Sequence, residues 1–231
     1  MAVLGTIVGP GTKTRKFVAD DLVWAVKMVT HETGHDPEYE KEWQAILWTV
    51  LNRWVGRYGQ PEESFGGYVQ RFSQPVNPNE IGRVHEYDYR TQEFERDLEE
   101  CSGTAGTEAC ALARARARWN RIENNRKRPL SWYEQNVPAI VTTVQKFMAG
   151  GLPNREFPGW TDFAAGYAGH GPEDTPVSTD GTFSNAFYQE TWAENWTGNT
   201  VKIVLPKRAG IGLLAALLLT AGAIVGMVWR R

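Results

Sequence analysis

The chain has few of the residues that hold small domains together covalently or through a metal. Its 231 residues include two cysteines and four histidines, which is too few for a disulfide framework or a cysteine-rich metal site. Cys101 and Cys110 bracket a short segment of small and polar residues. They fit either a local disulfide, which would indicate an oxidising destination, or two free thiols. The sequence leaves both open.

An excess of one charge is also missing. The chain carries 25 Lys and Arg against 27 Asp and Glu, a formal net charge of -2. This balance provides no overall basic field, so we expect no nucleic-acid partner. Tryptophan is abundant instead, with ten copies. Indole rings fill cores, and they also line clefts that stack flat sugar faces.

Long apolar runs are absent until the C-terminus. Residues 209–229 form a 21-residue run without a charge, flanked by basic residues on both sides. A helix of this length spans about 31 Å, the thickness of a bilayer's hydrocarbon core. We therefore expect residues 206–231 to be a transmembrane anchor in a lipid bilayer. Gly222 and Gly226 have the G-x-x-x-G spacing that would let two such helices associate.

The preceding residues predict one water-soluble domain over 19–205, after an irregular leader over 1–18 that is interrupted by glycine and proline. Helical spacing predicts a helix from Asp20 or Asp21 past Val29, and a buried helix in KEWQAILWTVLNRW. Residues 56–92 are predicted to form turns and residues 93–128 a charged surface helix. Another helix is predicted over 131–148. Loops and short strands are expected over 154–200. These patterns predict a mainly helical α+β fold.

Glu32 is the centre of the most informative segment, and the residues alone allow two kinds of chemistry there. His31, Glu32 and His35 spell H-E-x-x-H, in which two imidazoles one helical turn apart hold zinc and the glutamate is the base. This zinc site requires a helix through both histidines and a third ligand, and Pro37 lies just beyond His35.

The other chemistry uses Glu32 as a general acid. A carboxyl group at the end of an apolar helix, walled by aromatics, is poorly solvated when charged, which suits protonation of a glycosidic oxygen. One such acid fits a lytic transglycosylase, in which a hydroxyl of the sugar itself closes an anhydro ring. Ordinary hydrolysis requires a second carboxylate at a defined distance. Asp36, Glu38 and Asp88 are candidates by composition.

Four segments then carry a family resemblance, namely VKMVTHETG, AILWTVLNR, YVQRFSQPVNP and IVTTVQKFMAGGLPN. The first three, within residues 22–77, resemble the cell-wall hydrolase family that includes the spore-cortex-lytic enzymes, a branch of the lysozyme-like superfamily. In the Q-F-S element of that family, Phe72 and Ser73 match, Arg71 replaces the glutamine, and Gln74 follows one place late.

The resemblance implies a lysozyme-like domain with Glu32 as the catalytic acid. It also implies that Ser73, Gln74 and Asn77 contact the substrate, a peptidoglycan glycan strand, and that no metal or other cofactor is needed. We therefore expect a membrane-anchored peptidoglycan lytic transglycosylase or muramidase. The alternatives are a zinc metallopeptidase using His31 and His35, and a non-catalytic membrane-tethered structural protein.

The expected location follows from these functions. The N-terminal residues lack the basic leader, the full apolar stretch and the cleavage site of a secretory signal, yet the substrate lies outside the cytoplasm. A single-pass membrane protein of a bacteriophage virion, delivered from outside to open the host wall for the genome, would resolve this conflict. A bacterial membrane protein exported by another route is the alternative.

Overall fold

The computed structural model describes residues 3–11, 14–33, 40–73, 76, 130–165, 174–178 and 183–205. The four α-helices of these ranges are α1 (Ala19–Glu32), α2 (Glu40–Arg53), α3 (Phe65–Phe72) and α7 (Leu130–Met148). The six strands are β1 (Val3–Val8), β2 (Thr14–Val18), β3 (Asp162–Ala165), β4 (Asp174–Ser178), β5 (Asn185–Glu190) and β6 (Lys202–Val204). A π-helical turn over Trp54–Tyr58 follows α2 directly.

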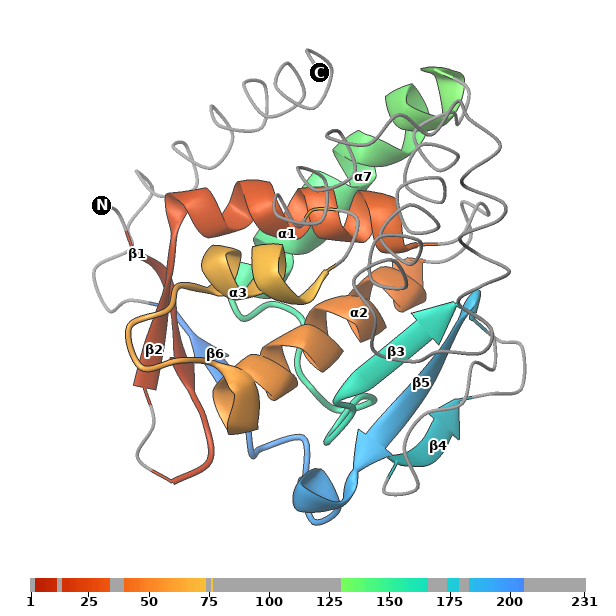
Figure 1. Ribbon diagram of the computed structural model, residues 1–231. Coiled ribbons are helices and arrows are strands. Elements are labelled where there is room, and N and C mark those ends of the chain that lie inside the picture. Colours follow the sequence, from red (N-terminus) through yellow and green to blue (C-terminus); the bar gives the residue numbers. More distant parts are fainter. Residues whose placement is uncertain are drawn as a thin grey trace, which may run out of the picture.

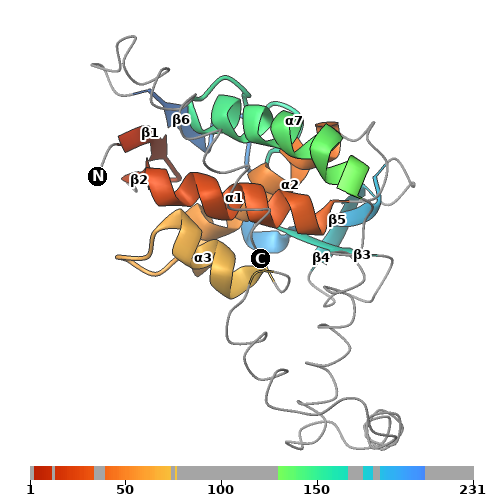
Figure 2. The same cartoon turned by 90° about the horizontal axis from the view of Figure 1, so that it is seen from above.

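The helices form the centre of the molecule. Helix α1 lies between α7 and α3 and contacts both (Figure 2). Helix α2 is buried on almost every side, from Glu42 to Asn52 except Gln44. Its large side chains pack against rings of the neighbouring elements, as Trp48 does edge-on against Phe147 at 5.0 Å between ring centroids. Burial of this apolar surface is the main stabilising contribution to the fold.

Two three-stranded antiparallel sheets lie on opposite sides of the helices (Figure 1). One has the strand order β2-β1-β6, and it joins residues from the two ends of the described chain, because Ile7 pairs with Ile203. The other has the order β3-β5-β4, with Asp162 opposite Tyr188 and Ala165 opposite Asn185. The second sheet brings Asn185, the first residue of β5, next to the C-terminal end of α1.

The three helices expected around Asp20 to Val29, in KEWQAILWTVLNRW and over 131–148 are confirmed. The last of them ends in a Schellman turn, in which Gly151 N donates to Lys146 O and Gly150 N to Phe147 O. Gly150 has φ +70°, a conformation that glycine adopts at little cost.

The expected fold class is wrong. The described residues contain four α-helices and two small antiparallel sheets, and they show no lysozyme-like fold. Residues 3–18 are not an irregular leader, because β1 and β2 pair there and Leu4, Ile7 and Phe17 enter the core. The glycines and proline at positions 9–11 lie between two strands, where turn-forming residues are favourable.

Helix α3 is a second departure, because it lies in the segment expected to be turns. Ser64 caps it, with its Oγ accepting a hydrogen bond from Gly67 N at 3.0 Å. Gly66 and Gly67 suggested a turn, but Gly66 is required by packing. A Cβ there would lie 2.8 Å from Trp24 Cδ1 and 3.1 Å from Asp21 Oδ1. The glycine therefore permits close approach of α3 to α1.

In the described ranges no helix is both long enough and apolar enough to cross a bilayer. The predicted anchor over 206–231, its apolar run 209–229 and the Gly222 and Gly226 pair lie outside the described residues, as do the charged segment 93–128, Cys101 and Cys110.

Candidate functional site

Glu32 is the last residue of α1, and its side chain is half-buried. Its carboxylate Oε1 accepts a hydrogen bond from Ser73 Oγ at 2.7 Å. Ser73 follows the last residue of α3, and its own backbone N–H donates to Val69 O at 2.8 Å. The ends of two packed helices therefore bring together a carboxylate and a hydroxyl that are 41 residues apart in the sequence.

The backbone at this end of α1 is held from two directions. Thr33 N donates to Val29 O at 3.0 Å, and Trp43 Nε1 from the first turn of α2 donates to Thr33 Oγ1, also at 3.0 Å. From β5, Asn185 Nδ2 donates to the backbone carbonyl of Glu32 at 2.9 Å. These bonds restrict how the Glu32 side chain can move relative to Ser73.

Behind this contact lies a buried carboxylate, Glu42, with no exposed surface. Its Oε1 accepts hydrogen bonds from Asn185 Nδ2 at 2.8 Å, from Asn185 N at 2.9 Å and from Ser184 Oγ. Its Oε2 is buried and has no hydrogen-bond partner in the part of the chain that the structure describes. Because Glu42 is enclosed, it can act on a substrate only through its neighbours.

Arg53, the last residue of α2, contacts a second cluster of polar side chains, which lies on the sheet of β3, β5 and β4. Its Nη1 lies 3.3 Å from Asp162 Oδ1 and 3.5 Å from Glu190 Oε2, and the guanidinium stacks 4.3 Å from the ring centroid of Tyr58. The Tyr58 hydroxyl donates to Glu190. Burial raises the pKa of Tyr58, and the hydrogen bond to Glu190 raises it further. The same guanidinium lies 5.0 Å from the ring of Phe72, the residue before Ser73.

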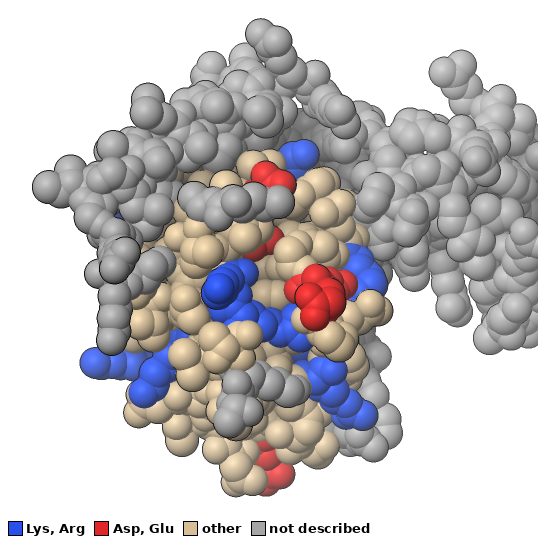
Figure 3. Space-filling model, turned by 90° about the vertical axis from the view of Figure 1, so that its left-hand side faces the viewer, with Lys and Arg blue, Asp and Glu red and all other residues tan. Residues whose placement is uncertain are grey.

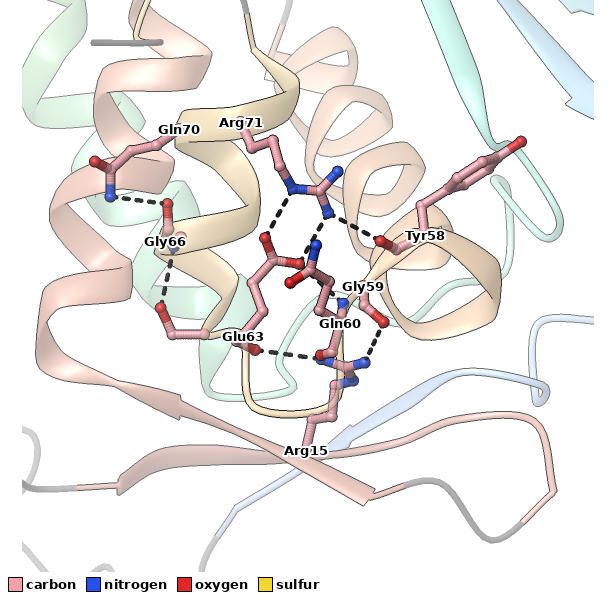
Figure 4. A network of polar contacts seen from close by, with 10 residues as sticks. Arg15, Tyr58, Gly59, Gln60, Glu63, Gly66, Gln70 and Arg71 are labelled. Atoms are coloured by element: carbon pink, nitrogen blue, oxygen red, sulfur yellow. Dashed lines mark hydrogen bonds and ion pairs between the residues drawn. The ribbon is translucent and has the colours of Figure 1, made fainter. Parts of the chain in front are cut away.

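A more exposed network joins the segment before α3 to Arg71 in the last turn of that helix (Figure 4). Arg71 Nε and Nη2 hold the two carboxylate oxygens of Glu63 at 2.9 and 3.0 Å, while Arg15 donates to Gly59 O and Gln60 O at 2.9 Å. Basic and acidic side chains lie close together on the side of the molecule where β1 and β2 are found (Figure 3). Burial opposes ionisation of Glu63, but Arg71 and the Gln60 N–H hold its pKa below the usual range.

The zinc alternative is not favoured by the local structure. Helix α1 ends at Glu32, so it does not continue through both positions of H-E-x-x-H, and His35 lies outside the described residues. Among the residues that are described, no group of three or more His, Cys, Asp or Glu could hold a metal ion. Helix α1 therefore does not itself supply the continuous helical face that this motif requires.

Of the predicted site residues, Glu32 and Ser73 are in direct contact, whereas Gln74 and Asn77 lie outside the described residues, as do Asp36, Glu38 and Asp88. Sequence reasoning did not select Glu42 or Asn185. The available signal for Glu42 was its place directly before the apolar run of a helix predicted to be buried, since a buried charge requires partners.

Comparison with protein-family models, with curated proteins and with solved structures finds no match to this chain.

Proposed function

We propose that the protein cleaves the glycan strand of peptidoglycan, with Glu32 as the general acid and base. The observation that supports this most directly is the hydrogen bond from Ser73 Oγ to Glu32 Oε1 at 2.7 Å. A half-buried carboxyl group has access to a substrate yet is shielded from bulk water, the environment in which a carboxylic acid can transfer a proton at neutral pH. Ser73 fixes the plane of that carboxyl group.

The chemistry needs one acid. Protonated Glu32 gives its proton to the glycosidic oxygen, and the bond from that oxygen to the anomeric carbon breaks. The resulting Glu32 carboxylate then takes the proton of the sugar's own primary hydroxyl as this oxygen attacks the anomeric carbon. The products are a free hydroxyl on one fragment and a 1,6-anhydro ring on the other, and Glu32 regains its proton.

The neighbouring carboxylates support a role for one acid more than for a pair. Glu42 is fully buried, and Asp162 and Glu190 are both within ion-pair distance of Arg53. A hydrolase with two carboxylates needs the second one directed at the anomeric carbon or at a water molecule beside it. Of these four described carboxylates, Glu32 is the one whose position fits direct contact with a glycan.

The test is to incubate the purified full chain with peptidoglycan and to identify the soluble products by mass. Anhydro ends are expected from the wild type; reducing ends would indicate a hydrolase, and cut peptides would favour the metallopeptidase. Glu32→Gln should release no fragments, while Glu194→Gln, the same substitution at an exposed glutamate, should behave like the wild type. Undiminished cleavage by Glu32→Gln, or no cleavage by the wild type, would refute the proposal.

The expected delivery of this activity from outside the cell, as part of a phage particle, stays a prediction. Its test is the presence of the protein in purified particles.

A further inference from the structure

The last turn of an α-helix leaves backbone carbonyl groups without partners inside the helix. In α1 one of these carbonyls belongs to Glu32 itself, and it accepts a hydrogen bond from Asn185 Nδ2 at 2.9 Å. Asn185 is the first residue of β5 and is buried. The backbone that carries the Glu32 side chain is therefore tied to the sheet through one amide group.

That amide group is itself held in one orientation. Its nitrogen carries two protons, and the second acceptor within reach is Glu42 Oε1 at 2.8 Å. Both neighbours of the nitrogen, a carbonyl oxygen and a carboxylate oxygen, can only accept. A flipped amide would place its oxygen against two acceptors, so the NH2 group must face them. Glu42 thus selects the orientation of Asn185 that can bind the end of α1.

The location of this pair makes it stiff. Glu42 has no exposed surface, and Asn185 is 5% exposed. The same carboxylate oxygen accepts from the backbone N–H of Asn185 at 2.9 Å, so the side chain and the backbone of Asn185 are both bound to it. Hydrogen bonds in such a poorly solvated place are stronger than on the surface, and removing one partner leaves the other unsatisfied.

Helix α2 therefore holds the end of α1 by two consecutive residues. Trp43 donates directly to Thr33 Oγ1, and Glu42 acts through Asn185 on the carbonyl of Glu32. We propose that Glu42 and Asn185 are positioning residues, which keep the carboxyl group of Glu32 in register with Ser73 without touching the substrate. The catalytic consequence rests on the proposed function; the mechanical part does not.

The experiment compares four variants of the full chain, namely Asn185→Ala, Glu42→Ala, Glu42→Gln and Asn154→Ala. Asn154→Ala is the matched control, because Asn154 is also a buried asparagine, 2% exposed, and it donates to Asn52 Oδ1 at 3.2 Å. Glu42→Gln is the conservative variant, because its amide oxygen can still accept from Asn185. The kinetic parameters kcat and KM are measured on soluble, uncrosslinked peptidoglycan.

Asn185→Ala and Glu42→Ala should each lower kcat by about 10-fold to 100-fold, because a small displacement of a catalytic group costs rates of this order. KM should stay within about twofold, since neither residue contacts the glycan in this proposal. Glu42→Gln should retain most of the activity, and Asn154→Ala should resemble the wild type. Equal losses in Asn154→Ala and Asn185→Ala would overturn the proposal, as would a loss confined to KM.

A second measurement separates this inference from the proposed function. Hydrogen exchange of the Thr33 amide, which closes the last turn of α1, should become at least about tenfold faster in Asn185→Ala and Glu42→Ala but not in Asn154→Ala. Unchanged exchange would overturn the positioning role even if the enzyme is active. If the wild type cleaves no peptidoglycan, the proposed function fails, and the exchange rates alone decide whether the pair holds this helix end.

Discussion

The two ends of α1 each present a carboxylate to α3, and the two carboxylates are used differently. At the N-terminal end, Asp21 Oδ1 accepts from Gly66 N at 2.7 Å, and its Oδ2 accepts from Val18 N, also at 2.7 Å. At the C-terminal end, Glu32 accepts from the hydroxyl of Ser73. The two sites are about 16 Å apart along the helix, and α1 and α3 run parallel between them.

The difference lies in burial and in the kind of donor. Asp21 has no exposed surface, and two backbone N–H groups hold it, so its role is to cap α1 and to join it to α3. Burial raises the pKa of Asp21 above its usual range, although these hydrogen bonds oppose the shift. Glu32 is half-buried beside a side-chain hydroxyl that can rotate. The same pair of helices therefore carries one structural carboxylate and one to which we assign proton transfer in the proposed function.

The largest expected effect is at the C-terminal end. Glu32→Gln keeps the size of the side chain and an acceptor for Ser73 but removes the transferable proton. The rate of glycan cleavage should fall by about 10³-fold, while the free energy of unfolding, measured in urea, should change by less than about 1 kcal/mol. A large loss of stability would mean that Glu32, like Asp21, is mainly structural.

The second largest effect is expected at the N-terminal end of α1, on stability. Asp21→Ala leaves the buried N–H of Gly66 and the partly buried N–H of Val18 without acceptors, so the free energy of unfolding should fall by about 2 kcal/mol. Cleavage by the fraction that remains folded should stay within about twofold. The exposed neighbour gives the matched control, because Asp20→Ala should change stability by less than about 0.5 kcal/mol. A specific loss of kcat in folded Asp21→Ala would remove the distinction between the two ends.

Ser73→Ala should have an intermediate effect on activity. It removes the hydroxyl that donates to Glu32 Oε1 but leaves the backbone bond from Ser73 N to Val69 O. We expect kcat to fall about tenfold, the equivalent of one hydrogen bond, with little change in the urea midpoint. Ser64→Ala, which removes the N-cap hydroxyl of the same helix, should do the reverse and lower stability at unchanged kcat.

The smallest expected effect concerns pH at the start of α3. The pKa of Glu63 is lowered in the folded state, so its stabilising contribution is present above the ordinary glutamate pKa and is lost as pH falls through the folded value. The stability difference between wild type and Glu63→Gln should be below about 1 kcal/mol at neutral pH, because the pair is partly exposed. This stability difference should become smaller as the pH is lowered, which urea unfolding measured at several pH values can show.

The control for this prediction is Glu62→Gln, at an exposed adjacent glutamate. It should change the free energy of unfolding at neutral pH by less than about 0.5 kcal/mol. A difference between wild type and Glu63→Gln that grows in acid would contradict the assigned direction of the pKa shift.

Much of the helical structure could be predicted, because the apolar residues of α1 recur at helical spacing, α2 is apolar nearly all round, and each of α1, α2 and α7 runs for 14 or more residues. The short strands of 154–200 were expected as well, but β1 and β2 were not. Strands β1 and β2 have only six and five residues, and β1 also pairs with β6, which lies far along the chain. Helix α3 was missed because Gly66 favours a turn in isolation, and the preference is overridden by its contact with Asp21 and Trp24.

The sequence by itself determined where α1 stops and that Glu32 stands at its end, since helix periodicity and the helix-breaking residues Gly34 and Pro37 are local properties of the chain. Only the tertiary structure decided what Glu32 meets there. Its contacts with Ser73 and Asn185 span 41 and 153 residues, and Glu42 is joined to Asn185 across 143 residues. Such contacts depend on how whole helices and strands pack, and no local pattern of side chains encodes that packing.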